Sequence, residues 1–165
     1  MITIRKATID DASLIREIAY KTWPETYKNI VSVIQLEYML ELFYNQKTLI
    51  ETISKKNHYF LLAFEHEICQ GFAAIEHHYL GNEITRLNKL YVLPKAQGKG
   101  IGKKLMDEVI DLAIEIGSSA INLNVNRFNK AHFFYSKIGF SILKEVDIEL
   151  DFGYLMEDFI MEKYL

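Results

Sequence analysis

The sequence predicts an α/β protein of the α+β kind, with a twisted, mixed and mostly antiparallel sheet of about six to seven strands flanked by helices. Several short segments alternate apolar and polar residues as strands do, and others space their apolar residues as amphipathic helices do. These segments follow one another as a strand, helices, three strands, a helix, a strand, a helix and two strands. Because the chain has 165 residues and no repeat or linker, we expect a single domain over residues 1–165.

The N-terminal third predicts one strand and three helices. Residues 2–7 alternate and form the strand, and Asp10 can cap the helix that follows. We expect Trp23-Pro24 to end or kink this helix, because proline disfavours helical geometry in the preceding residue. A second helix begins at Ser32, with Gln35 completing a capping box, and a third covers about residues 47–55. The buried faces of the first two helices are Leu14, Ile15, Ile18, Ala19, Leu36, Met39, Leu40 and Phe43.

The rest of the chain predicts six strands and two helices. Residues 58–64 and 68–79 form an antiparallel hairpin, and residues 83–93 form the strand that enters a glycine-rich loop. The long helix after this loop ends at Gly117. Residues 120–126 alternate strictly, and Asn129 caps a short helix that Gly139 terminates. The last two strands cover residues 141–150 and 154–163.

Composition and charge narrow the class of protein. Half of the residues are hydrophobic and a quarter are charged, as in a soluble globular protein. The net charge of −3 gives no reason to expect nucleic acid, and the longest apolar run, residues 59–64, is too short to span a membrane. We expect no signal peptide. Because Cys69 is the single cysteine, no intrachain disulfide can form; this fits a reducing cytoplasm, and Cys69 is expected to be a core residue.

The stretch from Leu90 to Lys104 predicts an anion-binding site. An apolar strand runs into Pro94, and Gly98, Gly100 and Gly102 follow before an amphipathic helix. Glycines permit left-handed backbone conformations that bring N–H groups close to a ligand. The start of the helix adds unpaired N–H groups and a partial positive charge. Full charges come from Lys99, Lys103 and Lys104.

Two other phosphate-binding motifs do not fit this loop. A Walker loop needs Ser or Thr after Gly-Lys, but Gly102-Lys103 is followed by Lys104. A dinucleotide fingerprint needs a third glycine at the position of Lys103. The remaining pattern is Gln97-x-x-Gly100-x-Gly102 after Leu-Tyr-Val-x-Pro. It resembles the GNAT superfamily of acetyl-CoA-dependent N-acyltransferases.

This resemblance covers nearly the whole chain and implies the GNAT fold, with acetyl-CoA as the cofactor and no metal. In the family the loop holds the diphosphate of coenzyme A. The preceding strand pairs with the pantetheine arm, and one of its N–H groups stabilises the oxyanion that forms during transfer. The residues at these positions are Leu90, Tyr91, Val92, Gln97, Gly98, Lys99, Gly100, Ile101, Gly102 and Lys103.

A second motif, from Asn129 to Phe140, supports the resemblance. It places an asparagine near the start of a helix, then Phe-Tyr, and closes in Lys-x-Gly-Phe. The family's pattern implies that Asn129 contacts coenzyme A and that Tyr135 lies beside its sulfur. There a protonated tyrosine can hydrogen-bond or protonate the leaving thiolate. His132 stands where the family usually has an aliphatic residue, which leaves the local packing open.

The sequence identifies no clear base for the acceptor amine. A lysine-like amine, with a pKa of about 10.4, is mostly protonated at pH 7, so either a group takes its proton or the site lowers its pKa. Asn88 stands where some relatives carry a glutamate, and an amide does not accept a proton usefully. The candidates are Glu76, His77, His78 and Glu83, each of which is also a typical surface residue.

The first two helices usually wall the acceptor site in this family. The segment that joins them here, residues 22–27, resembles bacterial GNAT members that acetylate polyamines or other small amines. Here Trp23 and Tyr27 can pack on an alkyl chain or an ammonium, and Glu25 can attract a cation. The competing interpretation of Trp23 is a buried contact between two helices. We also assign Asn124, on the polar face of the strand 120–126, to the acceptor side.

Three functional hypotheses follow. The favoured one is transfer of an acetyl group from acetyl-CoA to a primary amine of a small molecule, polyamine-like or amino-acid-like, or of a peptide, by direct attack in a ternary complex. The second is a non-catalytic acetyl-CoA-binding sensor or structural subunit. The third is a nucleotide-binding module, which the missing Ser/Thr and third glycine disfavour. Neither nucleic acid nor membrane is an expected partner, and the acceptor, the acyl chain and the formation of a homodimer stay open.

Overall fold

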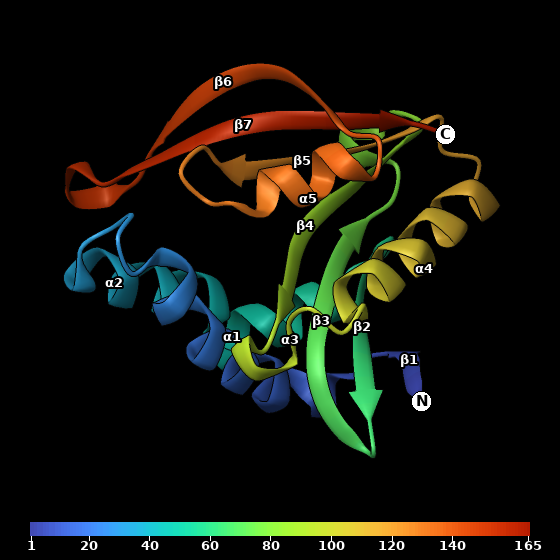
Figure 1. Cartoon of the computed structure of the whole chain (residues 1–165), viewed down its shortest axis with the longest axis horizontal. Helices are drawn as coiled ribbons and strands as arrows, with labels where there is room; N and C mark the ends of the chain where they lie inside the picture. The colour runs from blue at the N-terminus through green and yellow to red at the C-terminus, as the bar shows by residue number, and fades with distance from the viewer.

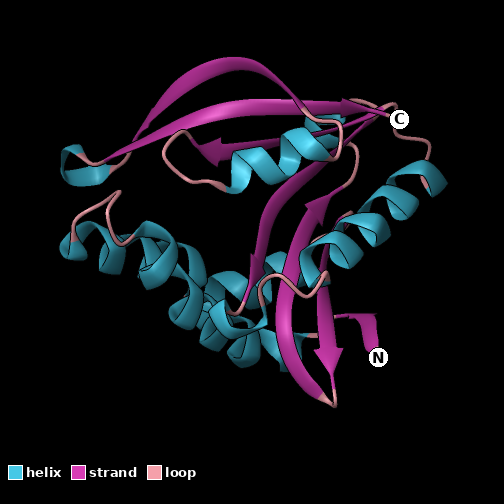
Figure 2. Ribbon diagram, viewed as in Figure 1, coloured by secondary structure: helices cyan, strands magenta, loops and turns pink.

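Seven strands form one mixed sheet in the order β1-β2-β3-β4-β5-β7-β6, in a computed structural model that describes residues 1–165 (Figures 1 and 2). Every neighbouring pair is antiparallel except β4 and β5, which run parallel. This confirms the predicted mostly antiparallel sheet. The strands are β1 (Ile2–Lys6), β2 (His58–Glu65), β3 (Ile68–Glu76), β4 (Ile84–Val92), β5 (Ala120–Asn126), β6 (Ser141–Glu149) and β7 (Leu155–Tyr164).

Helices cover both faces of the sheet (Figure 1). The α-helices are α1 (Ala12–Tyr27), α2 (Val33–Tyr44), α3 (Gln46–Ser54), α4 (Ile101–Glu115) and α5 (Ala131–Lys137). Single 3-10 turns lie at Ile9–Asp11, Tyr79–Gly81, Pro94–Ala96 and Asp151–Gly153. None of these helices combines the length and the apolar character needed to cross a bilayer.

Alternation along β2 and β3 produces two separate cores, because successive side chains of a strand point to opposite faces. Leu61 and Ala73 face the core under α4 and α5. Phe60 and Phe72 face the core under α1, α2 and α3. The predicted hairpin and the last two strands are confirmed with ends that differ by at most three residues, and the strand 120–126 is confirmed at both ends.

Of the two outcomes predicted at Trp23-Pro24, an end or a kink, the end is wrong, since α1 continues through Pro24 to Tyr27. Trp23 and Tyr27 are 3% and 7% exposed, and their ring centroids lie 4.8 Å apart. The burial of this last turn outweighs the hydrogen bond that a proline nitrogen cannot donate. The aromatic pair therefore lies on a helix rather than on a connecting loop.

The structure differs from the prediction in two details of the helix starts. Ser32 does cap α2, because its hydroxyl accepts the Gln35 N–H at 3.1 Å. The Gln35 side chain instead donates to the Leu155 carbonyl at 3.0 Å, so the capping box does not close. At the start of α1 the residue before the helix is Asp11, not Asp10.

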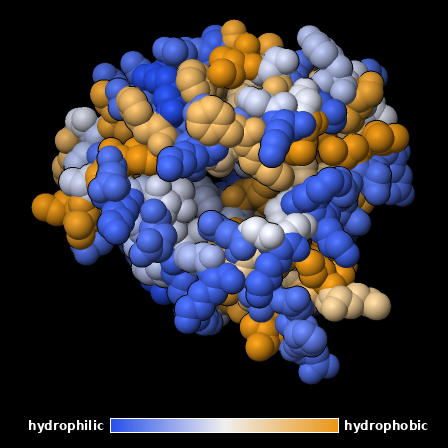
Figure 3. Space-filling view, in the orientation of Figure 1, coloured by the Kyte–Doolittle hydropathy of each residue, from blue (hydrophilic) through white to orange (hydrophobic).

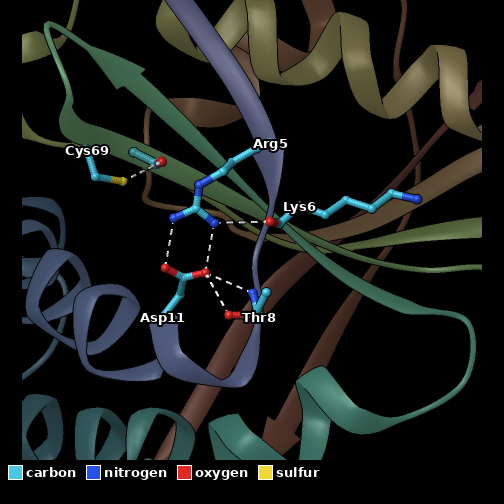
Figure 4. Close-up of polar contacts among 6 residues, drawn as sticks. Arg5, Lys6, Thr8, Asp11 and Cys69 are labelled. Carbon is cyan, nitrogen blue, oxygen red and sulfur yellow. Dashed lines mark hydrogen bonds and ion pairs between the residues drawn. The ribbon is translucent and has the colours of Figure 1, made fainter.

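A polar cluster around Asp11 ties the start of α1 to β1 (Figure 4). The Asp11 carboxylate accepts two hydrogen bonds from the Arg5 guanidinium, at 2.8 and 2.9 Å, and one from the Thr8 N–H at 2.8 Å. The hydrogen bond from Arg5 is the main reason that the pKa of Asp11 is lowered. Cys69 is also drawn in this view. Its thiol is buried and points to the Gly71 carbonyl at 3.5 Å, as expected for a core residue.

The sheet opens between its two parallel strands. β4 and β5 pair only from Ile84 opposite Ala120 to Leu87 opposite Leu123. Beyond that point β4 stays with β3 and β5 stays with β7, so the strands separate. The register of β3 against β4 shifts at Asn88, an irregularity of the kind that bends a strand. Figure 1 shows β4 passing from the half of the sheet with β5–β7 to the half with β1–β3.

Candidate active site

Two adjoining cavities meet where β4 and β5 separate, and Leu90, Tyr91 and Tyr135 line both of them. The first, which we call the loop cavity, has a volume of about 930 Å³ and extends along the glycine loop, the end of β4 and the start of α5. The second, the inner cavity, has a volume of about 360 Å³ and lies between α1, α2, β4, β5 and β7. The space-filling view shows the face of the molecule hollowed near its centre (Figure 3).

The glycine loop has the conformation that its sequence predicts. Gly98 and Gly100 have φ angles of +80° and +81°, and Gly100 is the residue that precedes α4. The first N–H groups of a helix have no partner within the helix, so they are free to bind an anion in the loop cavity. Gly102 differs from these two, because a Cβ there would lie at ordinary contact distance, 3.8 Å from Val92 and 4.0 Å from Phe134, so the packing does not require glycine at this position.

The predicted loop residues differ in whether they line the loop cavity and in what their side chains contact. Gln97, Gly98, Gly100, Ile101, Gly102 and Lys103 line the loop cavity, as Val92 and Asn129 do, whereas Lys99 is exposed and does not. The Gln97 amide donates to the Val92 carbonyl at 3.1 Å, so its side chain holds the loop to the strand. The Lys103 ammonium pairs with Asp107 at 2.9 Å. The residue before α5 is Lys130 rather than the predicted cap Asn129, but the Asn129 side chain accepts the Ala131 N–H, the first of the helix, at 2.9 Å.

The end of β4 presents backbone N–H groups to the gap, whereas the Val92 carbonyl already accepts the Gln97 amide. The Leu93 N–H donates to the Gln70 carbonyl on the β3 side at 2.8 Å. Because backbone groups alternate along a strand, those of Leu90 and Val92 point away from β3. β5 has already separated from β4 there, so the Leu90 N–H has no neighbouring strand to bind. An extended ligand can pair with this edge as a strand would.

Tyr135 lies at the junction of the two cavities. It comes from α5, is 7% exposed, and packs against Phe134 and Phe140. Burial raises the pKa of Tyr135 above its ordinary value, and the nearby Tyr27 adds to this effect. The phenol therefore stays protonated at neutral pH and is available as a hydrogen-bond donor. The Tyr27 and Tyr91 hydroxyls lie 3.2 Å apart.

The structure brings four of the predicted acceptor-side residues together, since Trp23, Tyr27, Asn88 and Asn124 all line the inner cavity. Both interpretations of Trp23 apply. Its ring packs among aromatic side chains of α1, α2 and β4, and it also forms part of the cavity wall. Glu25 lines the loop cavity instead.

The four candidate bases lie elsewhere: Glu76, His77, His78 and Glu83 line neither cavity. His77 is 6% exposed, and its Nδ1 atom is 2.8 Å from the Thr85 hydroxyl, which in turn contacts Ser118 at 2.7 Å. Burial lowers the pKa of His77, so the imidazole is a neutral member of a buried polar chain. Its place in this chain fits a structural role.

The inner cavity also contains three charged residues that were not predicted from the sequence: Arg86, Lys89 and Asp158. Arg86 donates to Asn124 at 2.6 Å, and Asn124 donates to Asp158 at 3.3 Å. Burial lowers the pKa of Lys89 to about 8 and raises the pKa of Asp158. Buried ionisable groups with shifted pKa values in a cavity are typical of functional sites. The alternating pattern of β4 and β7 gave no indication that these polar positions face a cavity.

Comparisons with known proteins agree with this geometry. A family model described as acetyltransferase (GNAT) domain matches residues 55–142. The spermidine N(1)-acetyltransferase of Thermoplasma acidophilum is 33% identical over 98% of this chain and 96% of its own length. A crystal structure of PaiA N-acetyltransferase from the same organism, in complex with coenzyme A, superposes with a TM-score of 0.85 at 30% identity, covering 100% of this chain and 99% of that one. An acetyltransferase of the GNAT family from Staphylococcus aureus superposes with a TM-score of 0.76 at 21% identity, covering 100% and 99%, and supports the fold.

The fold, the glycine loop and the open β4 edge define an acyltransferase that uses coenzyme A. The chain belongs to the GNAT acetyltransferase family. It is an acetyl-CoA-dependent N-acetyltransferase, which transfers an acetyl group to an amine.

Proposed function

We propose that the acceptor is the primary amine of a small polyamine-like or amino-acid-like molecule or of a peptide, attacked directly in a ternary complex. The observation that carries this proposal is the meeting of the two cavities at Leu90, Tyr91 and Tyr135. A cofactor in the loop cavity and an amine in the inner cavity can approach one point from two sides. The similarity to a spermidine N(1)-acetyltransferase over 98% of the chain favours a polyamine-like acceptor.

The loop cavity fits acetyl-CoA. Gly98, Gly100 and the first N–H groups of α4 suit the diphosphate, and the free edge at Leu90 and Val92 suits the pantetheine arm. Acetyl-CoA supplies an activated acetyl group as a thioester. The Leu90 N–H, turned into the gap, is placed to stabilise negative charge on the thioester oxygen.

Tyr135 serves the leaving sulfur as a hydrogen-bond donor. A thiol has a pKa of about 8.5, and burial raises the pKa of Tyr135 above its ordinary value. Complete transfer of the phenolic proton to the thiolate is therefore uphill, whereas a hydrogen bond to the developing negative charge is favourable. Of the two roles that the sequence left open for Tyr135, we therefore propose the hydrogen bond to the sulfur rather than its protonation.

The inner cavity suits an alkylamine. Trp23, Tyr27 and Tyr44 supply aromatic walls that can pack on methylene groups or face an ammonium. Asp158 supplies one negative charge in a wall that otherwise carries Arg86 and Lys89. An acceptor can therefore be held by its apolar body and oriented by its amine.

A free-thiol release assay with acetyl-CoA tests this proposal over spermidine, amino acids, aminoglycosides and peptides with free N-termini. We expect thiol release with at least one amine, and a single added acetyl group on that amine by mass spectrometry. Tight binding of acetyl-CoA by calorimetry without thiol release for any amine would contradict it and favour a sensor. Thermal stabilisation by ATP but not by acetyl-CoA would favour a nucleotide-binding module instead.

A further inference from the structure

Asp158 is the one carboxylate in the wall of the inner cavity. It is 2% exposed, and it lies on β7 opposite Asn126, at the end of β5 beside the gap. Carboxylates are rarely buried to this extent unless they are paired. No lysine or arginine side chain forms an ion pair with it, because Arg127 reaches only its backbone carbonyl, at 3.4 Å.

The Asp158 carboxylate is oriented by one neighbour. Its Oδ2 atom accepts a hydrogen bond from the Asn124 amide at 3.3 Å, and the Asn124 carbonyl is in turn held by Arg86 at 2.6 Å. The other oxygen, Oδ1, makes no hydrogen bond within the protein. Arg86 Nε also lacks a partner, but it is fully enclosed, whereas Asp158 Oδ1 is not. That oxygen is consequently accessible to a ligand in the inner cavity.

The electrostatic environment gives Asp158 the character of a base. Burial is the main influence and raises the pKa of Asp158, while the hydrogen bond from Asn124 and the charges of Arg86 and Arg127 act in the opposite direction. A carboxylate with a raised pKa holds a proton better than an exposed one and is nearer to the acceptor amine in basicity. It also attracts an ammonium into the cavity.

We propose that Asp158 is the catalytic proton acceptor of the reaction, and that it receives the proton of the acceptor's ammonium in the inner cavity. This inference rests on the function proposed above. The other groups available there do not suit the role: Asn88 is an amide, and Lys89, with a pKa of about 8, is mostly protonated at pH 7. Asp158 replaces the base candidates near the start of β4.

The ammonium of the acceptor gives one proton to the Asp158 carboxylate, and the nitrogen lone pair forms a bond to the thioester carbonyl carbon. The C–S bond breaks, and the electron pair leaves on sulfur, which receives the hydrogen bond of Tyr135. Loss of the second nitrogen proton yields the amide, and the thiolate takes up a proton to give free coenzyme A. Asp158 then releases its proton to solvent, so one proton appears in solution per turnover.

The test compares Asp158→Asn with Asp111→Asn, a control on an exposed carboxylate of α4. Spermidine is the first probe, and whichever amine the wild type acetylates replaces it. We expect kcat/KM at pH 7.5 to fall on the order of 10²-fold or more in Asp158→Asn and to stay near wild type in Asp111→Asn. Calorimetry with acetyl-CoA should give the same affinity in all three proteins, which shows that the fold is kept.

The pH profile separates a proton acceptor from a structural residue. In the wild type kcat/KM should rise as Asp158 ionises and then level off. In Asp158→Asn it should keep rising about tenfold per pH unit toward the amine's own pKa, near 10.4. The charge of Asp158 raises the pKa of Tyr27 and of Arg86, so the two profiles are compared below pH 9, where both side chains stay protonated in either protein. Other ionisable groups also face this part of the cavity. Those that line the inner cavity or contact Asp158 are Tyr27 of α1, Tyr44 of α2, Arg86, Lys89 and Tyr91 of β4, Arg127 after β5, and Tyr135 of α5.

Asp158→Ala provides a second, independent test, because it leaves room for a small carboxylate. Added formate should restore activity to Asp158→Ala in proportion to its concentration and should not restore Asp158→Asn, whose side chain fills the space. Unchanged kcat/KM in Asp158→Asn, or a rise in KM alone with unchanged kcat and pH profile, would overturn the proposal and leave Asp158 as a structural or anchoring residue. If the wild type released no thiol with any amine, the proposed function would fall as well.

Discussion

Replacement of Gly100 by alanine tests whether the backbone of the glycine loop binds acetyl-CoA. Gly100 has φ of +81°, and a Cβ built there meets no atom within 4 Å, so the cost is backbone strain without a clash. A left-handed conformation costs an L-residue about 1–2 kcal/mol. For a chain of this size, that lowers the melting temperature by about 2–8 °C, at about 2–4 °C per kcal/mol. If the free loop relaxes to avoid the strain, acetyl-CoA binding must restore the left-handed conformation. A cost of 1–2 kcal/mol then corresponds to about a 5- to 30-fold loss of affinity.

Gly117→Ala is the matched control. Gly117 has φ of +85°, also has nothing within 4 Å of a built Cβ, and lines neither cavity. In Gly117→Ala the strain should appear as a lower melting temperature, with wild-type affinity for acetyl-CoA by calorimetry. In Gly100→Ala the strain should appear as lost stability where the free loop keeps its conformation and as weaker binding where the loop relaxes, so the two losses together amount to about 1–2 kcal/mol. A Gly100→Ala variant with both wild-type stability and wild-type affinity would refute the argument that this loop holds the cofactor through its backbone conformation.

Three further predictions follow from the site. Tyr135→Phe should lower kcat on the order of 10²-fold and keep acetyl-CoA affinity, since the buried ring still packs and only the hydroxyl is lost; full kcat with chemistry limiting would disprove its role. The wild-type kcat/KM should rise from pH 6 toward 8 and fall only where Tyr135 ionises; because burial raises the pKa of Tyr135, a decline below pH 9 would count against it. Cys69→Ala should stay active, and acetyl-CoA alone should add no mass at Cys69, whose thiol is buried with a raised pKa; a competent acetyl-Cys69 species would overturn direct transfer.

The glycine loop could be predicted from sequence because its requirements are local. Positive φ at Gly98 and Gly100 and free N–H groups at the start of α4 depend on a few consecutive residues. The same holds for the strictly alternating strand 120–126, whose apolar residues are buried. Local chemistry decides such features, so the conformation of the loop and of this strand can be predicted from a few consecutive residues.

Pro24 shows how tertiary packing overrides a local rule. A proline four residues from the end of a helix removes one backbone hydrogen bond, and the sequence alone favours a break there. Trp23 precedes Pro24 in the chain and Tyr27 follows it. The two rings pack against one another, and both contact Tyr91 of β4. The apolar area buried by these aromatic rings outweighs one hydrogen bond, and only the packed structure reveals that area.

The base candidates predicted from the sequence lie around the start of β4, and strand geometry alone argues against them. Glu83 and Leu90 are seven residues apart on an extended strand, which at about 3.3 Å per residue separates them by roughly 23 Å. A group at the start of β4 therefore cannot reach a thioester beside Leu90, whatever its pKa. Asp158 is 68 positions from Leu90 in sequence, but β7 lies between β5 and β6 and places Asp158 opposite Asn126, at the mouth of the gap. That strand order is not encoded in any local pattern, so Asp158 becomes a candidate only in the structure, whereas four other residues of the inner cavity were predicted from the sequence.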